Sequence, residues 1–201
     1  IRMKKILIAT RNKGKVREFR DFFLKYDIEV ESLLDIQQDL PEVEETGKTF
    51  EENAAIKAEQ IAEILKVPVL ADDSGLMVDA LNGAPGIYSA RYAGEGKSDE
   101  DNNRKLLKEL YQVPKGERSA RFVCVLAIAI PGEETTFYRG ECEGEIGTEP
   151  KGINGFGYDP LFIPNDYEQT MAELDPSEKN KISHRSHAIR KLESWEKIIK
   201  G

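Results

Sequence analysis

Residues 10–15 bring a hydroxyl, an amide and several cations together at the predicted start of a helix. A helix start exposes backbone N–H groups and carries a partial positive charge, which favours anions and disfavours these cations. A phosphate would meet the N–H groups, the Thr10 hydroxyl, the Asn12 amide and the Lys15 ammonium at once. The pattern favours a phosphate site over a solvated basic turn, although its glycine spacing is not that of a Walker A loop. The candidate ligands are Thr10, Arg11, Asn12, Lys13, Gly14 and Lys15.

An acidic pair, Asp72 and Asp73, is followed by Ser74 and Gly75 and comes directly after an apolar run at residues 67–71 that predicts a buried strand. Open α/β sheets bind ligands just beyond the carboxyl ends of their strands, which suits these carboxylates to a metal ion or a water. Neighbouring side chains of an extended chain point to opposite sides. We therefore expect one carboxylate to face the substrate and the other to be structural or to reach a metal through a turn. An ordinary turn is the alternative.

Lys57 interrupts the apolar stripe of a helix predicted from a capping box at Thr49 to about residue 66. A buried ammonium needs a partner, whereas a lysine that snorkels along its alkyl stem does not, and the sequence leaves both readings open. Glu44 and Glu45, in the acidic loop just before this helix, could supply a carboxylate to Lys57 or to a divalent cation. A solvated acidic loop is the alternative for these glutamates.

Phe156 lies between glycines in a segment too broken to be a regular strand, residues 152–160. An aromatic ring in such a segment can offer an open face to a nucleobase, and a tight turn with the ring in the core is equally consistent. Lys179, His184 and Arg185 can each donate a hydrogen bond to a carbonyl on a base edge, or form a charged surface.

These side chains must be positioned by alternating strands and helices. The pattern predicts strands at residues 5–9, 28–31 and 67–71, an antiparallel hairpin at 119–130 and 135–146, and helices over 16–26, 50–66, from Ser98 to Leu110, and 186–200. Residues 35–47 are predicted to be an acidic loop. The fold class is α/β, with a mixed twisted sheet flanked by helices and two lobes around a central cleft. We expect one domain over residues 3–201, with Ile1 and Arg2 a remnant of expression.

Composition excludes several classes of protein. The chain of 201 residues has a formal net charge of −8, which disfavours a generic basic nucleic-acid binder. No apolar run reaches the roughly 20 residues of a membrane span, and the first residues lack the apolar segment of a signal peptide. Two cysteines without a metal-binding spacing indicate neither a disulfide scaffold nor a zinc site. We expect a cytoplasmic protein that binds neither nucleic acid nor membrane.

Taken together, the motifs resemble the inosine triphosphate pyrophosphatase family, the Ham1-like XTP/dITP diphosphatases. The resemblance covers the chain from Met3 onward and rests on six blocks in order: ATRNKGK at residue 9, EETG at 44 with Asn53 and Lys57, ADDSGL at 71, GAPGIYSARY at 83, GFGYDP at 155 and SHR at 183. One such block would be weak evidence, whereas all six in order are specific.

The resemblance implies a two-lobed homodimer that uses Mg²⁺ to hydrolyse nucleoside triphosphates to monophosphate and pyrophosphate, preferring ITP, dITP and XTP. It implies that Asp73 is the general base and that Mg²⁺ is held by carboxylates. The residues implied are Asp73, Lys15 and Lys57 for catalysis; Thr10, Arg11, Asn12, Lys13, Gly14, Lys15, Ser74, Phe156, Gly157, Tyr158, Asp159, Lys179, His184 and Arg185 for substrate; and Asp73, Asp72, Glu45 and Glu44 for the metal.

Base selection has a physical basis in this assignment. Phe156 would stack on the purine, and donors from Lys179, His184 and Arg185 match a 6-keto oxygen. Adenine would place an amino donor against those donors, and unpaired buried polar groups reject analogues strongly. Guanine has the same 6-keto group, so its rejection must come from elsewhere. Two alternatives remain: a Mg²⁺-dependent phosphohydrolase for other modified nucleotides, and a nucleotide-sensing binding module.

Overall fold

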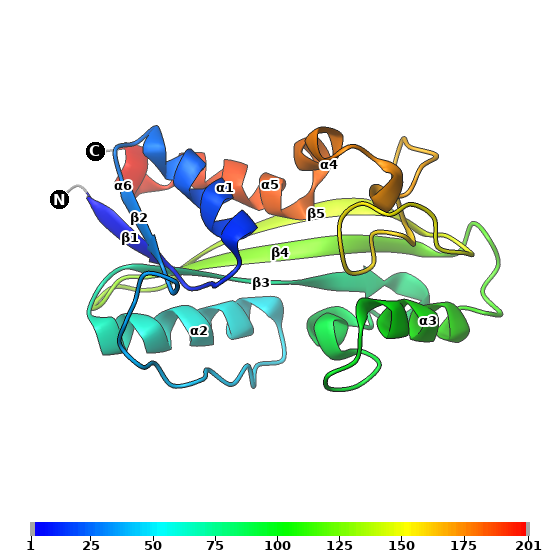
Figure 1. The fold of residues 1–201 in the computed structure, drawn as a ribbon, viewed down its shortest axis with the longest axis horizontal. Helices are drawn as coiled ribbons and strands as arrows, with labels where there is room; N and C mark the ends of the chain where they lie inside the picture. Colours follow the sequence, from blue (N-terminus) through cyan, green and yellow to red (C-terminus); the bar gives the residue numbers. More distant parts are fainter. Residues whose placement is uncertain (1–2, 200–201) are drawn as a thin grey trace. The chain divides into compact units, whose positions relative to one another are not determined.

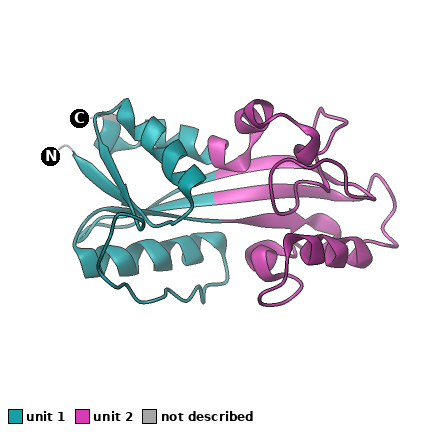
Figure 2. Ribbon diagram, in the orientation of Figure 1, with its two compact units in different colours: residues 1–73, 125–139, 188–201 teal, residues 74–124, 140–187 magenta. Residues whose placement is uncertain are grey.

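The computed structural model describes residues 3–199, so the expectation for Ile1 and Arg2 lies outside the described residues. The chain divides into two compact units (Figure 2). Unit 1 comprises residues 1–73, 125–139 and 188–201, and unit 2 comprises residues 74–124 and 140–187. The chain therefore passes between the units several times, and one of these passages falls directly after Asp73.

A six-stranded sheet has the strand order β2-β1-β3-β4-β5-β6. In unit 1, β1 pairs in parallel with β2 and β3; in unit 2, β5 pairs antiparallel with β6. The sheet is mixed, which confirms the predicted fold class. The strands are β1 (Lys5–Ile8), β2 (Glu29–Ser32), β3 (Val69–Val78), β4 (Ser119–Ala129), β5 (Thr136–Ile146) and β6 (Phe162–Pro164).

Two helices of unit 1, α1 (Lys13–Leu24) and α2 (Phe50–Leu65), cover opposite faces of the β1 and β3 strands (Figure 1). Helix α1 packs through Phe19 and Phe23, which are fully buried. Helix α2 follows the N-cap Thr49, whose hydroxyl accepts a hydrogen bond from the Glu52 N–H. The other half of the predicted capping box differs: the Glu52 carboxylate accepts from the Lys48 N–H at 2.6 Å. Because side chains alternate along β3, its two faces look toward different helices.

In unit 2 the core includes Leu106 of helix α3 (Asp99–Glu109), Leu110 at the end of that helix, and Phe162 of β6, all fully buried. Serine at position 98 caps α3 as predicted, in a capping box with Asp101. The helices of this unit are α3 (Asp99–Glu109), α4 (Pro176–Ile182) and the start of α5 (His184–Lys191), and its 3₁₀ segments are η1 (Asp79–Leu81), η2 (Gly86–Arg91) and η3 (Met171–Glu173).

Two predictions about element boundaries were wrong. The strand expected to end before Asp72 continues through the acidic pair to Val78, because Leu76 and Val78 are fully buried and override the turn preference of Asp-Ser-Gly. The helix expected over 186–200 is broken: α5 ends at Lys191, a 3₁₀ turn follows (η4, Leu192–Ser194), Trp195 is extended, and α6 is Glu196–Ile199. Residue 200 lies outside the described residues. The short β6 and α4 were not predicted.

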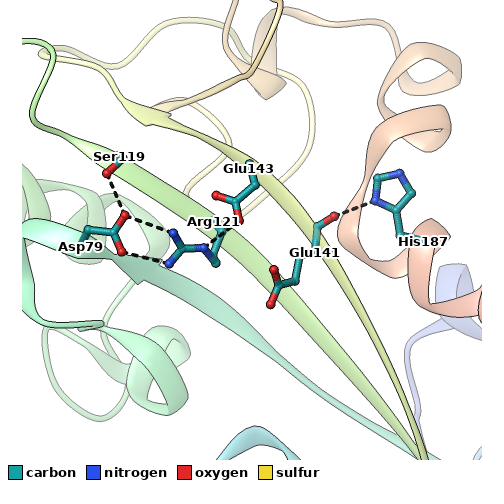
Figure 3. Close-up of polar contacts among 6 residues, drawn as sticks. All are labelled: Asp79, Ser119, Arg121, Glu141, Glu143 and His187. Carbon is teal, nitrogen blue, oxygen red and sulfur yellow. Dashed lines mark hydrogen bonds and ion pairs between the residues drawn. The ribbon is translucent and has the colours of Figure 1, made fainter.

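One charged network stands on unit 2, where Arg121 of β4 meets two carboxylates (Figure 3). Its guanidinium donates to Asp79 at 3.0 and 3.1 Å and to Glu143 at 2.9 Å, and the Ser119 hydroxyl donates to Asp79 at 2.7 Å. On the same strand pair, the carbonyl of Glu141 lies 2.7 Å from Nδ1 of His187. Arg121 is thus paired with two carboxylates, and the Asp79 carboxylate accepts from a guanidinium and a hydroxyl.

No helix among residues 3–199 combines the length and the apolar character needed to cross a bilayer. Cys124 and Cys142 are both buried thiols. Burial raises the pKa of Cys142 to about 11, so its thiol stays protonated at neutral pH.

Candidate active site

The basic segment at residues 10–15 folds into the start of α1, as predicted. The Asn12 side chain caps the helix by accepting from the Lys15 N–H at 2.9 Å, and the Thr10 hydroxyl accepts from the Asn12 N–H at 3.1 Å. The first turn contains no acidic residue. Arg11 and Lys13 are exposed. The helix start therefore presents N–H groups beside cations that no acidic residue of its first turn offsets, which suits it to a phosphate.

Lys15 is paired with Asp72, whose carboxylate lies 2.8 Å from the ammonium. The contact follows from the sheet register: Ile8, the last residue of β1, is opposite Leu70, so β3 extends past the end of β1 just where α1 begins. Asp72 is 7% exposed in its side chain. One of the two predicted carboxylates thus serves the basic segment directly.

Lys57 is half-buried on α2 and has the carboxylate partner that its position requires. Its ammonium lies 2.9 Å from Glu45 and donates to the backbone carbonyl of Asp72 at 3.2 Å. Burial alone would lower the pKa of Lys57, but Asp72, Glu45 and Asp73 outweigh it and raise the pKa, so the ammonium stays charged. Glu44, the other predicted acid, is exposed.

Asp73 of unit 1 has a carboxylate oxygen that its surroundings leave unsatisfied. Its Oδ2 is buried and, among the described residues, has no hydrogen-bond partner. Burial, followed by repulsion from Glu45, raises the pKa of Asp73 to about 7; Lys57 opposes this shift, Asp72 adds to it, and Asn53 opposes it weakly. A carboxyl with its pKa near neutrality can take up a proton during a reaction.

Asn53 is a site residue to which the sequence analysis gave no role. It is 1% exposed, and its Oδ1 accepts from the Gly47 N–H at 2.7 Å. Gly47 is close-packed there: a Cβ would lie 2.7 Å from that Oδ1 and 2.6 Å from Cβ of Glu52. Asn53 thereby fixes the end of the acidic loop that carries Glu45. Its spacing of one helical turn from Lys57 was the available signal.

The acidic groups of unit 1 fit a magnesium ion better than a cation that needs a protein cage. The described residues contain no group of three or more acidic, histidine or cysteine ligands arranged for a metal. Mg²⁺ usually takes one or two carboxylates and completes its shell with waters and substrate phosphates. Asp73, whose Oδ2 has no hydrogen-bond partner among residues 3–199, and Glu45, whose charge repels it, are the one or two carboxylates that such an ion needs.

In unit 2 a cavity of about 190 Å³ contains most of the predicted base-contacting residues. Sites for drug-sized ligands measure roughly 300–1,000 Å³, so this cavity suits one ring system rather than a whole nucleotide. Its lining includes Ser74, Phe156, Gly157, Tyr158, Asp159, Lys179 and His184.

Phe156 is 63% exposed, so the alternative that its ring packs in the core is wrong. The ammonium of Lys179 lies 4.7 Å from the ring centroid, within range of a cation–π contact. Lys179 is also 2.5 Å from Oδ2 of Asp159, which accepts from the Phe156 N–H at 3.2 Å. The ring, the ammonium and the carboxylate are thus tied into one arrangement.

His184 opens α5 and stacks on Phe122 with 5.0 Å between ring centroids and 20° between planes. Arg185 follows it and is half-buried. The Tyr158 hydroxyl donates to the Ser89 carbonyl at 2.6 Å. Phe122 and Ser89 line the cavity but were missed, because nothing in an alternating apolar strand or a 3₁₀ turn marks one residue as a cavity wall.

Comparisons with known proteins identify the family of this chain. The model of the Ham1 family matches residues 6–195. A dITP/XTP pyrophosphatase of Oceanobacillus iheyensis is 62% identical over 96% of this chain and 98% of its own, and one of Geobacillus kaustophilus is 57% identical over 99% and 98%. The solved structure of the Staphylococcus aureus Ham1 protein is 48% identical, with a TM-score of 0.89 over 96% of this chain and 97% of that one. This chain therefore belongs to the Ham1 family.

Proposed function

We propose that this protein hydrolyses non-canonical purine nucleoside triphosphates, dITP, ITP and XTP, to the nucleoside monophosphate and pyrophosphate. The printed names of its relatives, dITP/XTP pyrophosphatase, support this reaction. The observation that carries it in the structure is the buried, orphaned Oδ2 of Asp73 beside the Lys57–Glu45 pair. A protein that only senses nucleotides needs no carboxyl with its pKa raised toward neutrality.

The reaction joins a water oxygen to the α-phosphorus and breaks the bond from that phosphorus to the bridging oxygen of the leaving pyrophosphate. We assign Asp73 as the general base that takes the proton from this water. Its pKa of about 7 matches the proton affinity that such a base needs near neutral pH. Lys57, held charged by its carboxylate neighbours, would offset the negative charge that grows on the phosphate.

The start of α1 would hold the phosphate chain through its N–H groups, Thr10, Asn12 and Lys15. Arg11 and Lys13, both exposed, would add charge attraction. Asp72 was counted among the metal ligands from the sequence. Its contact with Lys15 favours a different role, which is to keep the ammonium in place until phosphate arrives.

Magnesium fits the remaining acids, Asp73 and Glu45. When bound, the ion would offset phosphate charge and orient the pyrophosphate as it leaves. The protein's own contribution is to hold the Asp73 and Glu45 carboxylates close enough to repel each other, and this repulsion helps to raise the pKa of Asp73. Glu44 is exposed, so we give it no part in this site.

The cavity of unit 2 would take the purine, with Phe156 stacked on it and donors from Lys179 and His184 on the 6-keto oxygen. Arg185, next to His184, would add a further donor. Loss of these pairings with adenine would separate ITP from ATP by the cost of unpaired buried donors.

The test is product identification with ITP, dITP, XTP, ATP and GTP, with Mg²⁺ and with EDTA, in water enriched in ¹⁸O. We expect pyrophosphate and a monophosphate that carries the label, rapid turnover of the first three substrates, and arrest by EDTA. Orthophosphate as product, label in pyrophosphate, or equal rates on ATP and ITP would contradict the proposal. Binding of ITP without turnover would identify a sensing module instead.

The family resemblance also supports a homodimer in the cytoplasm. Light scattering of the purified protein tests the dimer: a mass of twice the 22.7 kDa of the chain is expected, and a mass of one chain would contradict it.

A further inference from the structure

Phe156 sits on a loop that cannot hold the ring in place by itself. We call residues 152–159 the base loop; apart from turns it has no regular structure. The ring is flanked by Gly155 (φ +74°) and Gly157 (φ +61°), both in the left-handed region. Glycine has the largest conformational freedom of any residue, so an exposed ring between two glycines needs to be fixed from outside the loop.

Two side chains of helix α3 form hydrogen bonds with Gly157 and so fix the base loop. Asp99 accepts from the Gly157 N–H at 2.8 Å, and Asn103 donates to the Gly157 carbonyl at 3.0 Å. Residues four apart lie on one helix face, one turn apart. Because one bond holds the N–H and the other the carbonyl, together they set both the position and the orientation of the peptide chain that follows Phe156.

Asn103 is retained at a cost to stability, which argues for its role. It is 7% exposed, and its Oδ1 is buried with no hydrogen-bond partner among the described residues. An apolar side chain of the same size would avoid that unpaired oxygen. The gain that offsets it in the structure is the single bond from Nδ2 to Gly157.

The rest of α3 is a rigid support. Its first turn is closed by the capping box of Ser98 and Asp101, and its far end is anchored by the fully buried Leu106 and Leu110. On the other side of the base loop, Asp159 accepts from the Phe156 N–H, and Lys179 lies against the ring. The Phe156 ring is therefore held both by Asp159 and Lys179 and, through Gly157, by helix α3.

We infer that Asp99 and Asn103 are positioning residues for base selection: they set the place of the Phe156 ring relative to the donors of the cavity. This inference rests on the proposed function. Discrimination between a keto and an amino group depends on donors that lie within hydrogen-bond range of that group. If the Phe156 ring shifts, the stacked base shifts relative to these donors, and an amino group can then avoid facing them. Asn103 acts on the ring through Gly157, whereas Asp99 also lines the cavity itself.

The variant that tests this is Asn103→Leu, which keeps the volume and removes the donor. We expect the KM for ITP to rise about five- to tenfold, the size of one lost hydrogen bond, with kcat within about twofold. The ratio of kcat/KM for ITP over ATP should fall by a similar factor. Inhibition by inorganic triphosphate, which has no base, should be unchanged. Asp99→Ala should act like Asn103→Leu, while Asp99→Asn, which keeps an acceptor oxygen, should restore most of the selectivity.

Lys108→Ala is the matched control, since Lys108 is exposed on the same helix and should leave all these values unchanged. Hydrogen exchange of residues 155–158 provides a second measurement that needs no activity, and Asn103→Leu should speed it. If Asn103→Leu weakens inorganic triphosphate as much as ITP, or leaves both the ITP/ATP ratio and the exchange unchanged, the inference is overturned. If the wild type fails to hydrolyse ITP, the proposed function fails, and unchanged exchange in the variant would then reject the positioning role on its own.

Discussion

Two groups of charged side chains in this protein differ in how completely they are satisfied. In unit 2, the Arg121 guanidinium donates hydrogen bonds to both Asp79 and Glu143 (Figure 3). In unit 1, Lys57 bonds Glu45, but Asp73 nearby is left with a buried oxygen that has no partner among the described residues. Charges that are fully paired are typical of a network that stabilises the fold. A buried carboxylate oxygen without a partner is typical of a functional site.

The two aspartates show the same difference in their protonation. Hydrogen bonds from Arg121 and Ser119 lower the pKa of Asp79, so its charge is stabilised by folding. Burial and the repulsion of Glu45 raise the pKa of Asp73 to about 7, so folding destabilises its charge. The same residue type thus contributes to stability with opposite signs in the two units.

The largest expected effect comes from removing the unsatisfied acid. Asp73→Asn keeps the shape of the side chain but cannot take a proton, so kcat for ITP should fall by at least about a hundredfold, the scale of a lost general base. Steady-state kinetics measure the rate, and calorimetry should still detect binding of ITP. A variant that turns over at nearly the wild-type rate would remove Asp73 from this role.

Asp79→Asn is the control for that experiment, because it makes the same chemical change in the satisfied network. Its kcat for ITP should match that of the wild type, since the Asp79 carboxylate is hydrogen-bonded to Arg121 and Ser119 of the structural network. A comparable loss of activity in both variants would show that the contrast between the two networks has no functional meaning.

The next effect concerns stability without metal. A native pKa of about 7 for Asp73, above that of the unfolded chain, means that the native state binds the extra proton, so unfolding free energy falls as pH rises from about 4 to 7. In EDTA, the Tm of the wild type should therefore fall more than the Tm of Asp73→Asn between pH 5 and 8, by roughly 5 °C or more. Thermal melts at both pH values measure this. Equal pH dependence of the two proteins would mean that Asp73 is not destabilised in the fold.

The smallest effect is expected in the satisfied network. Arg121→Met keeps much of the apolar stem and removes the charge, and partly exposed ion pairs contribute only about 1 kcal/mol, so Tm should fall by roughly 2–4 °C. Activity on ITP should be unchanged. Because the low pKa of Asp79 stabilises the fold only above that pKa, the difference between variant and wild type should shrink as pH falls through the acid range. A loss of turnover in Arg121→Met would contradict a purely structural role.

Local sequence signals predicted a large part of this molecule. The predicted N-caps Thr49 and Ser98 located α2 and α3, and Lys57 stood out because it broke an apolar stripe. These signals act over one or two helical turns, where spacing in the sequence is spacing in space.

What the sequence did not predict depends on contacts between distant residues. Lys15 and Asp72 are 57 positions apart, and Asn103 and Gly157 are 54 apart, so no spacing rule connects them. The length of β3 was also hidden, because Asp-Ser-Gly favours a turn unless Leu76 and Val78 are buried by the rest of the chain. The sequence thus located most of the side chains but not the partners that hold them.

The continuous course of β3 has a consequence for how this gene can vary. Asp73 ends unit 1 and Ser74 begins unit 2, and the strand runs through this junction without a break. Since side chains alternate along a strand, one inserted or deleted codon here would turn Leu76 and Val78 to the opposite face. We therefore expect that insertions and deletions are not tolerated at this junction. They should be tolerated in exposed turns such as residues 131–134.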